Sequence, residues 1–303
     1  MSAPEKRAAK FPLRLDELGS RGNEARKPAV PGVRLLPLAA ALMTTAPRLQ
    51  PTAAAARAVL RPQRPLAHAH THASRRIGPS GLGLDSADVR RRMAERLRAA
   101  GIGHAQVLDA MAAVPRHRFV DAALVTQAYE DTSLPIGHGQ TISKPSVVAR
   151  MIELAMGGTN ARATRSLGRT LEIGTGCGYQ AAVLALLATQ VVSVERLRPL
   201  HDKARELLAP MRPANMRLVY GDGMLGHPPN APYDSIVAAA GGDTLPPAWL
   251  NQLAVGGRLV APLRQAGSHR QMLVVVDRTE RGFEQNTFEA VHFVPLKSGL
   301  VAG

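Results

Sequence analysis

Three glycines that alternate with other residues give the chain its clearest chemical signal. They lie in Glu172-Ile-Gly-Thr-Gly-Cys-Gly178, at the end of a short apolar segment. Glycine allows a sharp backbone turn and lets a ligand contact main-chain N–H groups without a Cβ in the way. A dinucleotide-binding fingerprint would need its third glycine at the position of Tyr179, and the Lys-Ser or Lys-Thr pair of a phosphate-binding loop is missing. The spacing favours a ligand without a pyrophosphate, and a plain strand–helix turn is the structural alternative.

Three carboxylates indicate which ligand these glycines suit. Glu195 ends a second apolar segment about twenty residues after Gly174, where a carboxylate can accept hydrogen bonds from both ribose hydroxyls. Asp222, in a Gly-Asp-Gly sequence after a third segment, lies where it can bind an adenine amino group. Glu172 would tolerate a positively charged amino group. An adenosyl sulfonium has ribose hydroxyls, an adenine amino group and a positively charged amino group, so we expect S-adenosylmethionine as the cofactor.

Cysteine chemistry and membrane insertion are not indicated. Cys177 lies between two of the glycines, but no His or Asp pattern beside it would activate the thiol, so packing is the favoured interpretation. One cysteine cannot form an internal disulfide, and no Cys/His spacing is typical of a zinc site, so no metal is expected. The longest uninterrupted apolar run, 181–188, is far shorter than the roughly 18 residues of a membrane-spanning helix.

The segments before the glycine-rich motif predict helices and one long loop. Apolar residues recur at i, i+4 and i+8 from Val89 to Leu97, which is typical of an amphipathic helix, and Gly101 ends it. Further helices are predicted over 104–114 and 145–156. The polar, Gly-rich segment 129–145 is interpreted as a long functional loop.

From residue 170 onward, predicted strands alternate with predicted helices. This alternation predicts an α/β fold with a doubly wound, mostly parallel sheet, in which ligands bind at the carboxyl ends of the strands. The strands are predicted over 170–173, 190–195, 216–220, 233–238, 259–261, 271–276 and 290–296, and helices over 179–188 and 199–209.

Most of the positive charge lies in the first 82 residues. The chain carries a formal charge of +15, and residues 1–82 contribute +10 of it, from 14 Lys and Arg against four acids. This stretch also holds ten of the 23 prolines and has no sustained apolar periodicity. Such a segment cannot bury enough apolar surface to offset the entropy lost on ordering. We therefore predict a disordered basic extension over 1–82 and a folded domain over 83–303.

The role of this extension is open between three interpretations. A solvated linker or overlong gene start is favoured over weak, salt-sensitive contact with nucleic acid or another polyanion, and over a targeting segment. Arginines without interleaved aromatic residues argue against specific nucleic-acid binding. His68, His70 and His72 alternate here, and a solvated run is favoured over adventitious metal binding.

Several segments resemble the signature of the protein-L-isoaspartate O-methyltransferases. The resemblance rests first on the segment 129–145, with its specific Gln140-Thr-Ile-Ser-Lys-Pro145 block, and on the glycine-rich segment 171–180. It continues in Tyr220-Gly-Asp-Gly223, Ala231-Pro-Tyr-Asp-Ser-Ile-Val237, Gly256-Gly-Arg-Leu-Val-Ala-Pro262 and Phe293-Val-Pro-Leu296. It runs in collinear order from about Ser86 to Leu296, whereas residues 1–82 match nothing in that family.

The resemblance implies a fold, an activity and a set of site residues. The fold is Rossmann-like, of the class I methyltransferase type, with N-terminal helices. The activity is methyl transfer from S-adenosylmethionine to the α-carboxylate of L-isoaspartyl residues in damaged proteins and peptides, after which the ester cyclises to a succinimide and hydrolysis restores some aspartate. Ser143 corresponds to the family's active-site serine. The candidate cofactor-binding residues are Thr141, Ile142, Ser143, Glu172, Gly174, Thr175, Gly176, Gly178, Glu195, Arg196, Asp222 and Gly223.

The implied chemistry needs little acid–base help. A carboxylate is already ionised at pH 7, so its attack on a sulfonium methyl group needs no strong general base. Ser143 could donate a hydrogen bond that orients this carboxylate. His138, in the same segment, is interpreted as an orienting or structural residue rather than as a base.

Two alternatives of different classes stay open at this stage. One is an S-adenosylmethionine methyltransferase that acts on a small molecule or RNA, and the other is a cofactor-binding module without catalysis. We expect a cytoplasmic monomer whose partners are isoaspartyl proteins and peptides, without membrane association, and with nucleic-acid contact limited to the basic extension.

Overall fold

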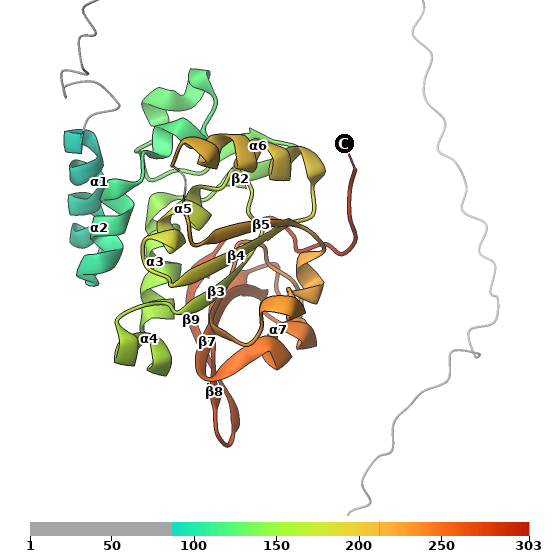
Figure 1. Ribbon diagram of the computed structural model, residues 1–303. Coiled ribbons are helices and arrows are strands. Elements are labelled where there is room, and N and C mark those ends of the chain that lie inside the picture. Colours follow the sequence, from blue (N-terminus) through green and yellow to red (C-terminus); the bar gives the residue numbers. More distant parts are fainter. Residues whose placement is uncertain (1–86, 212, 303) are drawn as a thin grey trace, which may run out of the picture. The chain divides into compact units, whose positions relative to one another are not determined.

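The computed structural model describes residues 87–211 and 213–302 (Figure 1). The chain begins there with two helices, α1 (Ala87–Ala99) and α2 (Ala105–Ala113), which pack against each other. Both bury the apolar stripe that the sequence predicts, with Met93 and Leu97 inward in α1. The first two predicted helices are confirmed.

The segment that follows contains a hairpin where a loop was expected. After the short 3₁₀ helices η1 (Arg116–Phe119) and η2 (Ala122–Gln127), the strands β1 (Leu134–Gly137) and β2 (Gln140–Ile142) pair antiparallel. The prediction of a loop over 129–145 was therefore wrong for Leu134–Gly137 and Gln140–Ile142, which form strands. Buried and exposed residues alternate along β1 as in any half-buried strand. The turn uses Gly137, His138 and Gly139, whose φ angles are 96°, 54° and 67°.

A seven-stranded sheet forms the centre of the domain. Its order is β5-β4-β3-β6-β7-β8-β9, with β3 to β7 parallel and the last two strands antiparallel. This confirms the doubly wound, mostly parallel prediction. The remaining elements are α3 (Pro145–Met156), α4 (Thr159–Thr164), β3 (Arg169–Ile173), α5 (Tyr179–Ala185), β4 (Gln190–Glu195), α6 (Arg198–Leu208), η3 (Ala209–Met211), β5 (Met216–Tyr220), η4 (Gly223–Leu225), η5 (Pro228–Asn230), β6 (Tyr233–Ala238), α7 (Pro247–Gln252), β7 (Leu253–Arg264), β8 (Gln271–Thr279) and β9 (Gly282–Val291).

The sheet separates two apolar cores. Val191, Val237 and Val260 belong to a core shared with α1, α2, α3 and α5, whereas Leu171 and Val192 belong to a core shared with α7. Because successive residues of a strand point to opposite faces, both faces of the central strands are covered. A polar side chain inside these strands is therefore buried whichever face it points to.

The C-terminal part differs from the sequence prediction. A last strand was predicted over 290–296, but β9 ends at Val291, and β8 with β9 forms a long hairpin that projects from the sheet (Figure 1). Most β9 side chains are exposed, so the strand lacks the apolar run that would reveal it. Beyond it the chain returns to the domain through hydrogen bonds from Gly241 to Val294 and from Leu296 to Gly241. Among the described residues, no helix is long and apolar enough to cross a membrane.

Candidate active site

A cavity of about 240 Å³ lies where the carboxyl ends of β3, β4 and β6 meet the β1–β2 hairpin. In the sheet, β3 lies between β4 and β6: β4 and β5 follow on one side of it, and β6 and β7 on the other. Open α/β sheets bind ligands at such a switch in strand order. The predicted residues that line the cavity are Thr141, Ile142, Ser143, Gly174, Thr175, Gly176, Glu195, Arg196 and Gly223. Three others do not line it: Glu172, Gly178 and Asp222.

The glycine loop between β3 and α5 borders the cavity, and side chains at its glycines would occupy space there. Gly174 and Gly176 have φ angles of 88° and 57°, a region that L side chains rarely adopt. A Cβ on Gly176 would lie 3.2 Å from Cδ1 of Ile136 in β1. Gly178 has another role, because a Cβ there would lie 2.8 Å from Leu208 of α6. Gly174 and Gly176 keep the cavity open, and Gly178 lets the loop pack on a helix.

Glu195 connects the glycine loop to the end of β4. Its carboxylate accepts hydrogen bonds from the Gly176 and Leu197 N–H groups, each at 2.9 Å. It is 5% exposed and lines the cavity. Each carboxylate oxygen can accept more than one hydrogen bond, so ribose hydroxyls could still bind there.

Glu172 lies behind the cavity. Its Oε2 accepts a hydrogen bond from Ser193 Oγ at 2.5 Å, and Ser193 is 2.6 Å from the hydroxyl of Thr175, which lines the cavity. Burial raises the pKa of Glu172 to about 8, although Ser193 and Gln180 lower it in part. Glu172 reaches the cavity through two hydroxyls, and at neutral pH it is mostly a neutral acid.

Asp222 and Arg196 hold the C-terminal segment. The Asp222 carboxylate accepts hydrogen bonds from Met224 N–H at 2.9 Å, as the cap of η4, and from Gly299 N–H at 2.6 Å. The Arg196 Nε donates to the Gly299 carbonyl. Sequence reasoning assigned neither the Asp222–Gly299 nor the Arg196–Gly299 contact, since Gly299 lies 77 residues from Asp222 and 103 residues from Arg196.

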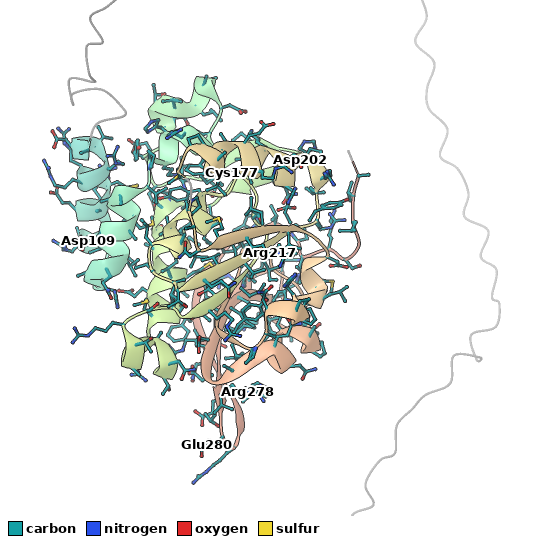
Figure 2. The ribbon with its side chains drawn as sticks, viewed as in Figure 1. Asp109, Cys177, Asp202, Arg217, Arg278 and Glu280 are labelled. Atoms are coloured by element: carbon teal, nitrogen blue, oxygen red, sulfur yellow. The ribbon has the colours of Figure 1, made fainter. Side chains whose placement is uncertain are left out.

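Further cavity residues were not among the candidates. They include Ile136, His138, Tyr179, Gln180, Ala239, Ala240 and the segment 294–297. The Phe293-Val-Pro-Leu296 match and the position of Ala239 after β6 were the available sequence signals. Cys177 also lines the cavity, and burial raises its pKa to about 11, so its thiol is protonated at neutral pH. Figure 2 shows Cys177 at the opposite end of the domain from Glu280, which lies between β8 and β9.

The arrangement is suited to positioning rather than acid–base catalysis. The lining comes from two groups of elements: the glycine loop with the buried Glu195 at the strand ends, and Thr141, Ile142 and Ser143 at the end of the β1–β2 hairpin. Ser143 is half-buried and Ile142 is buried. The glycine cradle fits a cofactor that approaches the main chain closely.

Comparisons with known proteins agree on one family. The family model described as protein-L-isoaspartate(D-aspartate) O-methyltransferase (PCMT) matches residues 88–300. A protein-L-isoaspartate O-methyltransferase of Methylibium petroleiphilum is 56% identical over 99% of each chain, and one of Burkholderia vietnamiensis is 48% identical over 97% of this chain and 99% of the other. The first alignment includes most of residues 1–82, so the expectation that this stretch has no counterpart was wrong.

Solved structures give the same result. A protein-L-isoaspartate O-methyltransferase structure is 29% identical, with a TM-score of 0.62, over 70% of this chain and 67% of that one. A Plasmodium falciparum structure described as a beta-aspartate methyltransferase in complex with S-adenosyl-L-homocysteine has a TM-score of 0.58 at 22% identity, over 69% of this chain and 98% of that one, and shows the shared fold. With the family match over most of the chain, these similarities show that the chain belongs to the protein-L-isoaspartate O-methyltransferase family.

Proposed function

We propose that this enzyme transfers a methyl group from S-adenosylmethionine to the α-carboxylate of L-isoaspartyl residues in damaged proteins and peptides. The observation that carries the proposal is that one cavity is lined by both the glycine loop and the block Thr141–Ser143. Membership of the family supports the L-isoaspartyl residue as the substrate. It does not favour a small-molecule or RNA methyltransferase, or a module without catalysis.

In the proposed site, Ser143 is the catalytic residue that touches the acceptor. Its hydroxyl donates a hydrogen bond that aligns the substrate carboxylate, which attacks as an anion and needs no base. S-adenosylmethionine supplies the methyl group as an electrophilic sulfonium. Gly174, Gly176 and Glu195 hold it, and the remaining cofactor candidates border the same cavity or support it.

Two segments that are far apart in the sequence border the proposed site. Segment 294–297 and the β1–β2 hairpin both line the cavity, and both would lie beside the reacting groups. The product is a methyl ester, which cyclises to a succinimide with loss of methanol. Hydrolysis of the succinimide returns part of the material as normal aspartate, which is the repair.

We also propose that residues 83–303 form the catalytic domain and that the enzyme acts as a cytoplasmic monomer. Among the described residues, those that line the cavity lie between Ile136 and Lys297, within the proposed domain. The single cysteine agrees with a reducing compartment. We propose that residues 1–82 contact nucleic acid only weakly and through charge.

A pair of peptides tests the function. The protein is incubated with methyl-labelled S-adenosylmethionine and either an isoaspartyl peptide or its aspartyl twin. Base-labile label is expected on the isoaspartyl peptide and not on the twin. Equal labelling of the two peptides would reject the repair function.

A further inference from the structure

Arg116 is a charged side chain in an unusual position. It lies in η1, is 0% exposed, and forms no ion pair with any acidic side chain among the described residues. A buried charge is costly unless it is well satisfied by partners. The contacts of Arg116 therefore indicate what the fold gains from it.

Those contacts join the two ends of one segment. Nε donates to the Ala128 carbonyl at 2.8 Å, and Nη2 donates to the Ser143 carbonyl at 2.7 Å. Nη2 also lies 3.5 Å from the Thr132 carbonyl. The β1–β2 hairpin lies between these ends, so one guanidinium closes the base of the segment that carries Ser143.

The same guanidinium also contacts the helix that follows the glycine loop. Its Cζ lies 4.8 Å from the centre of the Tyr179 ring, and Tyr179 is the first residue of α5 after the glycine loop. Tyr179 is buried and lines the cavity. Arg116 thus lies between the buried ring of Tyr179 in α5 and the backbone of Ser143.

We propose that Arg116 is a positioning residue that fixes the backbone of Ser143 and thereby aims its hydroxyl at the acceptor carboxylate. This inference rests on the proposed function. A planar guanidinium can bond to carbonyls in several directions at once, whereas the ammonium of lysine is a compact charge on a flexible stem. Asp131 makes a second link between the two ends of this segment, because its carboxylate accepts hydrogen bonds from Ser146 N–H and Oγ at 2.8 and 2.7 Å.

The test compares Arg116→Lys and Arg116→Met with Arg118→Met, a matched control from the exposed side of η1. Arg116→Lys is expected to lower kcat for an isoaspartyl peptide by about tenfold or more, because misplaced reacting groups slow the attack. The affinity for S-adenosyl-L-homocysteine, measured by calorimetry, should stay within about threefold in that variant, since Arg116 is not among the residues that line the cavity and lysine keeps its charge. Arg118→Met should match the wild type. Wild-type kcat in both Arg116 variants would overturn the proposal.

A double-mutant cycle separates positioning from general stability. If Arg116 acts through Ser143, Arg116→Lys should cost little further kcat in a Ser143→Ala background. Independent, multiplying effects of the two substitutions would overturn the proposal, as would full activity of Ser143→Ala. Arg116→Lys keeps the buried charge, so the cycle can be completed even where Arg116→Met does not fold. Failure of the function itself would appear separately, as equal methylation of the isoaspartyl and aspartyl peptides by the wild type.

Discussion

The two sides of the cavity are built in different ways. The proposed cofactor side consists of strand ends and the glycine loop, and the parallel ladder of β3, β4 and β6 fixes its backbone. The proposed acceptor side is a short hairpin whose ends are held by the side chains of Arg116 and Asp131. The strands of the first side are held on both edges by neighbouring strands, whereas the two short strands of the second side form a two-stranded sheet of their own and depend on side-chain bonds at their ends. The acceptor side should therefore respond more sharply to single substitutions outside the cavity.

The largest effect is expected where the two sides meet. Gly176→Val should abolish S-adenosylmethionine binding, because the new Cβ would lie 3.2 Å from Ile136 and the φ of 57° is unfavourable for a β-branched residue. Calorimetry on the folded variant measures this loss.

Gly101→Ala is the matched control for the backbone strain of that variant. Gly101 also has a positive φ, 105°, but a Cβ there would meet no atom within 4 Å. This variant should bind the cofactor normally even where its stability falls. Undiminished affinity in Gly176→Val would remove the glycine loop from the cofactor site.

The second effect belongs to the acceptor side alone. Ser143→Ala should lower kcat for an isoaspartyl peptide on the order of 10²-fold through lost alignment, and cofactor affinity should fall only modestly. Ser143→Thr keeps the hydroxyl and should recover part of the activity. The peptide assay and calorimetry are run on the same samples, and full activity of Ser143→Ala would leave Ser143 without a catalytic role.

The two sides also differ in how well the sequence predicts them. The strands of the cofactor side and the glycine spacing follow from local patterns, and Gly174, Gly176 and Glu195 all line the cavity. The hairpin was missed because its alternation spans only four residues. The contacts of Arg116 with Ser143, and of Asp222 with Gly299, join residues 27 and 77 positions apart, and no local pattern encodes them.

Glu172 gives a third prediction, about the sheet beneath the cofactor side. Its pKa is about 8 in the folded protein against a usual 4.5, so the folded state keeps a proton that the unfolded state loses. The free energy of unfolding should therefore fall as pH rises between these two values, by up to about 1.4 kcal/mol per pH unit from this group. Glu172→Gln cannot ionise and should show a flatter dependence. Urea unfolding at about pH 5 and about pH 7.5 measures the difference, and parallel curves for the two proteins would contradict the assignment.

The smallest effect is expected from removal of residues 1–82, which should leave both sides of the cavity intact. Among the described residues, every one that lines the cavity lies between Ile136 and Lys297, so turnover of a short isoaspartyl peptide should change by no more than about twofold. The shortened protein also loses +10 of the +15 formal charge, so any retention on nucleic acid should fall and lose its dependence on salt. Kinetics and thermal unfolding on matched samples distinguish the outcomes. A large loss of turnover without loss of stability would mean that the first 82 residues take part in the site. The site would then consist of three regions of the chain rather than two.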